Sequence, residues 1–166
     1  FSSDVIFTDV ITTPELKTSE SYVEIKCDKY FDGFELKEAY PYEFADADGW
    51  AVVPLEVTTH GDVVDYYYDI YVGDLTGDDA PTDNQLILDL AEYGRKNEPI
   101  AMSYCYFYEP LTLVYFAKDG DDNNSVVTRV PMFLYPETAN DVSEFNYYDT
   151  QSAAKQLYRR EFSATR

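Results

Sequence analysis

The sequence predicts an α+β fold: a single domain with a mainly antiparallel sheet of about six or seven strands and two helices. Three observations support this prediction. Many segments have a side-chain period of two and follow one another through short turns, two segments have helical spacing, and strands and helices do not alternate strictly. We assign residues 1–20 to an N-terminal strand or linker and residues 21–166 to the domain.

The strongest β character lies in the second half of the chain, in residues 100–135. Residues 100–108 and 111–117 alternate between two faces that are both largely apolar or aromatic, which is typical of strands covered on both sides. An acidic turn-forming segment then predicts a hairpin to a third strand at 126–135. Pro131 in that strand has no N–H for the ladder, so we expect the strand at a sheet edge or with a bulge.

The first half of the chain predicts a β-meander with short turns. Residues 21–29, 50–59 and 63–72 alternate as strands, and residues 34–44 predict an irregular strand. This series of strands precedes the first predicted helix, which is the order expected for an α+β domain rather than for a repeated strand–helix unit.

Two segments predict helices. Residues 83–96 carry an apolar stripe at helical spacing, and either Asp83 or Thr82 can cap the N-terminus of this helix. Residues 150–163 predict a second helix, because apolar residues such as Ala154 and Leu157 recur at helical spacing.

The charge of the chain is strongly negative, with 12 basic residues against 32 acidic ones and a net charge of −20. Such a surface repels phosphates, so we expect no direct binding to nucleic acid. The same charge suits cationic partners, metal ions or solubility, and a salt-adapted proteome would also produce it. The hydrophobic content of 45%, with 17 Tyr and 10 Phe, predicts a folded core despite this charge.

The two cysteines, Cys27 and Cys105, both lie in predicted strands. We expect a pair of buried thiols. The alternative is a disulfide, which would require Cα atoms within roughly 7 Å, a distance that a sequence does not supply. No Cys-x-x-Cys motif is present. The chain begins at Phe1 without an initiator methionine. A signal peptide or membrane anchor upstream of Phe1 is one explanation, and an arbitrary boundary is the other.

Three acidic turns suggest a calcium site, which is the one cofactor that the sequence offers. Calcium is bound by about six to eight oxygen atoms, and the best candidates for ligands are Asp119, Asp121 and Asp122. None of the acidic turns has the spacing of an EF-hand loop. The alternative is that Asp, Asn and Gly occur here because they form turns.

No group of residues predicts an enzyme. His60 lies in a Thr-His-Gly-Asp turn and is expected to be exposed, and the Ser and Thr residues lie in no nucleophile-elbow or phosphate-loop motif. A pair of catalytic carboxylates would need a separation of roughly 5–10 Å, which a sequence does not supply. We therefore expect a non-enzymatic protein.

Tyrosine is the most unusual feature of the composition. In the predicted strand 63–72, Tyr67 and Tyr71 point away from the face that their neighbours share, and together with Trp50 they are our candidates for a ligand-binding surface. The alternative is that the rings pack the sheet and its rims. Other tyrosines with the same two interpretations are Tyr66, Tyr68, Tyr104, Tyr106, Tyr108, Tyr115, Tyr147 and Tyr148.

The sequence therefore predicts an acidic, tyrosine-rich extracytoplasmic module, secreted or anchored to the cell surface, that binds a protein or a glycan. Coplanar exposed rings would indicate a glycan, and an apolar patch or open sheet edge would indicate a protein. The alternative is an acidic inhibitor that mimics DNA and binds a basic nucleic-acid-binding protein, in which case the acids should form a continuous stripe. A calcium-stabilised structural module is the third hypothesis.

Overall fold

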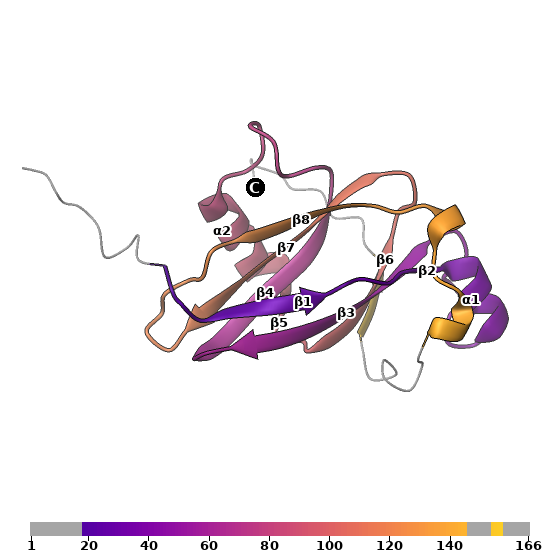
Figure 1. The fold of residues 1–166 in the computed structure, drawn as a ribbon, viewed down its shortest axis with the longest axis horizontal. Helices are drawn as coiled ribbons and strands as arrows, with labels where there is room; N and C mark the ends of the chain where they lie inside the picture. The colour runs from indigo at the N-terminus through magenta and orange to yellow at the C-terminus, as the bar shows by residue number, and fades with distance from the viewer. Residues whose placement is uncertain (1–17, 146–153, 158–166) are drawn as a thin grey trace, which may run out of the picture.

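Two β-sheets lie against each other in the computed structural model, which describes residues 18–145 and 154–157 (Figure 1). Sheet A has five strands in the order β1-β3-β6-β9, with β2 also paired to β3, and sheet B has four in the order β5-β4-β7-β8. All pairs are antiparallel except β6–β9, which is parallel. The strands are β1 Tyr22–Lys26, β2 Phe31–Asp32, β3 Ala51–His60, β4 Val63–Val72, β5 Arg95–Lys96, β6 Ile100–Cys105, β7 Pro110–Asp119, β8 Thr128–Phe133 and β9 Ala154–Leu157.

The central core fills the space between the two sheets. Alternate residues of the long strands point into it, as the side-chain period of two requires. Sheet A supplies residues such as Val53 and Leu55 from β3, and sheet B supplies residues such as Tyr68, Ile70 and Leu113 from β4 and β7. The remaining members of this buried cluster are Val23, Ala51, Tyr66, Ala101, Cys105, Leu111, Ala117 and Leu134.

Helices cover the outer faces of both sheets, and α1 and α2 lie on opposite sides of the molecule (Figure 1). Helix α1 (Gly33–Ala39) covers sheet A together with the turn η4 (Val142–Glu144), in a cluster that includes Leu36 and Phe145. Helix α2 (Asp83–Tyr93) covers sheet B through Leu86 and Leu90. Sheet B is therefore buried on both faces along β4 and β7, which explains the apolar character of both strands.

Local sequence signals explain where α2 begins and ends. The Thr82 side chain accepts from the Gln85 N–H while the Gln85 side chain accepts from the Thr82 N–H, so two donors of the first turn are satisfied by one capping box. The helix ends before Gly94, whose N–H donates to the Leu90 carbonyl. The next two residues then form β5.

The predicted fold class is confirmed: the chain is a single α+β domain with mainly antiparallel sheets. The predicted edge position of Pro131 is also confirmed, since β8 is the last strand of sheet B among the described residues. The number of strands was underestimated, because β2 and β5 have only two residues each and are too short to show a period.

Three predicted elements need correction. The first predicted helix, 83–96, ends at Tyr93 because Arg95 and Lys96 pair with β4. The predicted irregular strand at 34–44 is wrong, since α1 occupies 33–39 with Asp32 as its N-cap. The predicted second helix, 150–163, is wrong at Ala154–Leu157, where the chain pairs with the edge of β6 instead. The rest of that segment lies outside the described residues, as do residues 1–17 of the predicted strand or linker at 1–20.

Candidate functional site

The structure places the predicted ligand-binding residues on opposite outer faces of the two sheets. Tyr67 and Tyr71 do leave the face of their neighbours, but α2 covers them, and their exposed fractions are 8% and 0%. Tyr67 stacks on Phe116 with ring centroids 5.1 Å apart, and the Tyr71 hydroxyl donates to Asp89 of α2. Both rings are therefore packing residues in this structure.

Trp50 is half-buried on the other side of the molecule, beside the cluster under α1. Its ring lies 5.2 Å from that of Tyr106. Because sheet A and sheet B lie between Trp50 and the two tyrosines of β4, the three predicted residues do not form one surface.

Of the three predicted calcium ligands, Asp119 and Asp122 use their carboxylates in contacts within or beside the turn, and Asp121 takes part through its backbone N–H. The Asp119 carboxylate accepts from the backbone N–H groups of Asp121 and Asn123 and from the Ser19 hydroxyl. Asp122 has a left-handed backbone and pairs with Lys118 at 3.3 Å. Within the described part of the chain, no three His, Cys, Asp or Glu side chains gather in a way that could hold a metal ion. The acidic turn is thus explained by turn geometry.

The single histidine and the two cysteines form no site either. His60 stacks on Tyr22 with centroids 4.6 Å apart, and its Nε2 lies 2.7 Å from Glu24 Oε1. Both cysteines are free thiols; Cys105 is buried as predicted, whereas Cys27 is only half-buried. Burial raises the pKa of the Cys105 thiol, and burial together with the nearby Asp28 charge raises that of Cys27, so both thiols are kept in the unreactive protonated form.

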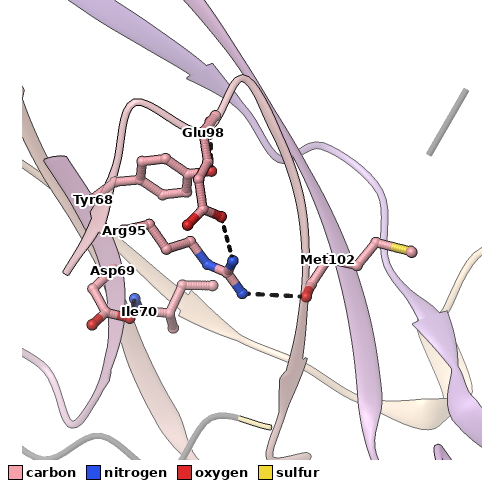
Figure 2. Close-up of polar contacts among 6 residues, drawn as sticks. All are labelled: Tyr68, Asp69, Ile70, Arg95, Glu98 and Met102. Atoms are coloured by element: carbon pink, nitrogen blue, oxygen red, sulfur yellow. Dashed lines mark hydrogen bonds and ion pairs between the residues drawn. The ribbon is translucent and has the colours of Figure 1, made fainter. Parts of the chain in front are cut away.

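A buried polar cluster lies where sheet B meets sheet A (Figure 2). The Arg95 guanidinium, almost fully buried, points to the Glu98 carboxylate at 2.7 Å and to the Met102 carbonyl oxygen of β6 at 3.5 Å. The Tyr68 hydroxyl donates to the Glu98 carbonyl at 2.8 Å. These bonds connect β4, β5 and β6, so we interpret the cluster as a structural link between the sheets.

Exposed aromatic rings gather at one end of sheet B, where β8 ends and β7 begins. Tyr108, Phe133 and Tyr135, which we call the aromatic patch, have exposed fractions of 54%, 44% and 42%. The centroids of Tyr108 and Tyr135 are 5.8 Å apart with the rings at 77°, and those of Phe133 and Tyr135 are 5.0 Å apart with the rings at 33°. The Tyr135 ring thus contacts both other rings, and all three are open to solvent.

Hydrogen bonds to neighbouring segments hold the backbone of the aromatic patch in place. The Tyr30 hydroxyl accepts from the Tyr135 N–H at 3.2 Å and lies 3.1 Å from the Tyr135 carbonyl oxygen. It also contacts the Thr138 hydroxyl of the turn η3 (Pro136–Thr138). Asn140, which follows η3, also binds the backbone of Tyr30. Its N–H donates to the Tyr30 carbonyl at 2.8 Å, and its side chain accepts from the Tyr30 N–H. The chain after Tyr135 is therefore attached to the Tyr30 segment at a second point.

Tyr108 has an uncommon backbone conformation, with φ at 62°. A bulky residue in the left-handed region is strained by roughly 1–3 kcal/mol and persists only where its surroundings fix it. Two bonds do so here: the Tyr108 N–H donates to the Leu134 carbonyl at 2.9 Å, and its hydroxyl donates to Glu137 Oε2 at 2.7 Å. The bond from Tyr108 lowers the pKa of Glu137, which keeps this carboxylate anionic beside the rings.

Sequence reasoning recognised Tyr108 as one tyrosine among many but did not single out the aromatic patch. The residues come from two segments about 25 positions apart, and only the pairing of β7 with β8 brings them together. A local signal was present in hindsight: Tyr108 precedes the strand break at Glu109-Pro110, and Tyr135 directly precedes Pro136. Side chains at such breaks often leave the regular alternation of the strand.

Comparison with known proteins gives no relative: no family model, no curated protein and no solved structure matches this chain. None of the helices in the described residues is both long enough and apolar enough to cross a membrane.

Proposed function

We propose that this protein is a non-enzymatic binding module, and that the aromatic patch is the surface by which it contacts a protein ligand. The observation that carries the proposal is the exposure of three contacting rings on a backbone fixed by hydrogen bonds. Tyrosine supplies a large contact area at low entropic cost, and rings held in advance lose little freedom on binding. The strain at Tyr108 is typical of a position retained for function.

The geometry of the rings favours a protein ligand over a glycan. A sugar ring stacks on a flat aromatic face, and a chain of sugars needs several coplanar faces. Tyr108 and Tyr135 are nearly perpendicular instead. Perpendicular rings form an uneven apolar surface of the kind that irregular side chains of a protein fill.

The proposed setting is extracytoplasmic, either secreted or attached to the cell surface. Support comes from the acidic, tyrosine-rich composition of the chain. An acidic body keeps such a domain soluble while it presents aromatic rings to water.

A selection experiment tests the proposal on the full chain. A displayed random-peptide library would be selected on the purified protein, and the enriched peptides would be measured against two variants. Tyr135→Ala removes the central ring of the aromatic patch, and Tyr42→Ala removes a ring that is 92% exposed and has no part in it. A glycan array would be probed in parallel with the same three proteins.

We expect enriched peptides to bind Tyr42→Ala like the unmodified chain and to lose about tenfold or more in affinity to Tyr135→Ala, as is usual for a central tyrosine of an interface. Peptides that bind both variants equally would contradict the proposal. Patch-dependent binding on the glycan array instead of the peptide library would contradict the assignment of a protein ligand.

A further inference from the structure

We infer that the aromatic patch recognises a cationic side chain of its protein ligand, with arginine as the preferred residue. The guanidinium would lie over an exposed ring face and against the Glu137 carboxylate. This inference rests on the proposed function, and it adds the chemistry by which the partner is selected.

The chemistry of the rings favours a cationic side chain. The face of a tyrosine ring carries negative partial charge and attracts a cation within about 6 Å of its centroid. The edge-to-face contact of Tyr108 and Tyr135 places two differently oriented faces beside each other. A planar guanidinium can stack on one face while its N–H groups point to an acceptor beside it, which an ammonium group does less well.

The Glu137 carboxylate lies beside the rings and is oriented to accept hydrogen bonds. Both of its carboxylate oxygens lie within hydrogen-bond distance of the Tyr108 hydroxyl, at 2.9 and 2.7 Å. That single hydroxyl donates one proton, whereas a carboxylate has about four acceptor sites. Glu137 therefore keeps acceptors for a guanidinium and is already oriented by Tyr108. The carboxylate also stays anionic to lower pH than usual, because the hydroxyl lowers its pKa.

The local charge and the overall charge of the chain both favour a cationic ligand. The two segments that form the aromatic patch, 106–110 and 133–138, contain two acids, Glu109 and Glu137, and no Lys, Arg or His. The whole chain carries a net charge of −20. A cationic ligand would thus be attracted at long range and find no competing basic residue in these segments, whereas an acidic ligand would be repelled.

The test is an NMR titration of the full chain with two capped tripeptides, acetyl-Gly-Arg-Gly-amide and its citrulline counterpart. Citrulline has nearly the shape of arginine without the charge. The ring signals of Tyr108, Phe133 and Tyr135 report on the aromatic patch. Two variants are compared: Glu137→Gln, which removes the proposed anion, and Glu92→Gln, which removes an exposed anion on α2.

We expect saturable shifts of the ring signals with the arginine peptide, binding about tenfold weaker for the citrulline peptide, and a similar loss in Glu137→Gln but not in Glu92→Gln. Equal binding of the arginine and citrulline peptides would overturn the inference. An absence of ring shifts with the arginine peptide would also overturn it.

The two proposals fail in different ways. If library peptides still depend on Tyr135 while arginine shows no preference over citrulline, only the inference of a cationic ligand is overturned. If library peptides bind independently of Tyr135, the proposed function itself is overturned.

Discussion

Leu90 of α2 offers a sharp test of why the tyrosines of β4 are buried. Its side chain is fully buried in the cluster that also contains Tyr67 and Tyr71. Leu88, two residues earlier on the same helix, is 71% exposed. Replacing each leucine by alanine makes the same chemical change at one position inside the packing and at one position outside it.

The expected magnitude for Leu90→Ala follows from its burial. Leucine and alanine differ by three carbon atoms, which corresponds to about 2.4 kcal/mol of transfer free energy at roughly 0.8 kcal/mol each. The cavity that remains adds to this, so a loss of about 2–5 kcal/mol in the free energy of unfolding is expected. Leu88→Ala should change it by less than about 0.5 kcal/mol, because an exposed side chain loses little contact.

Urea denaturation of both variants, followed by tyrosine fluorescence and circular dichroism, measures these changes. The midpoint should fall clearly for Leu90→Ala and stay near that of the unmodified chain for Leu88→Ala. Equal losses in the two variants, or no loss in Leu90→Ala, would refute the conclusion that α2 covers Tyr67 and Tyr71.

Three further predictions concern Tyr108, Glu137 and the cysteines. Tyr108→Gly should lose less of the free energy of unfolding than Tyr108→Ala, by up to about 1 kcal/mol, since both variants lose the ring and its hydroxyl bond but only glycine adopts a positive φ freely; an equal or larger loss for the glycine variant in urea denaturation would contradict the strain at this position. Tyr108→Phe should return the pKa of Glu137 toward its ordinary value in an NMR pH titration, because it removes the hydroxyl that lowers it. In the unmodified chain the stabilisation from Glu137 is present above its ordinary pKa and lost as the pH falls through the lowered one, and identical titrations of the two proteins would argue against the bond. A thiol reagent should leave Cys105 unmodified and react slowly with half-buried Cys27 in the native protein, but modify both in denaturant; rapid native modification of Cys105 would contradict its burial.

Much of the fold followed from local patterns. The alternation along 100–117 predicted strands buried on both faces, and Pro131 predicted the sheet edge, because period and missing N–H groups are properties of the chain itself. The start of α2 was predicted to within one residue, since Thr82 and Asp83 were both possible caps and Thr82 is the cap observed. These features need no knowledge of what packs against them.

Other features depended on tertiary structure and were missed. Ala154–Leu157 has helical spacing, yet it pairs with the free edge of β6, which supplies hydrogen-bond partners that a sequence pattern does not reveal. Tyr67 and Tyr71 were chosen as candidate ligand-binding residues from the strand pattern alone. That pattern does not show that α2 covers their face of the sheet. Period two shows which rings share a face of a strand, but not whether that face is covered.

The most direct test of the aromatic patch is hydroxyl-radical footprinting of the full chain, alone and with a selected library peptide. Alone, Tyr108, Phe133 and Tyr135 should be oxidised readily while Tyr71 stays protected, in keeping with their exposed fractions. With the peptide bound, these three residues should become protected, and the exposed Tyr42, which is not part of the aromatic patch, should react as before. Protection on another face, with the aromatic patch still fully reactive, would contradict the account.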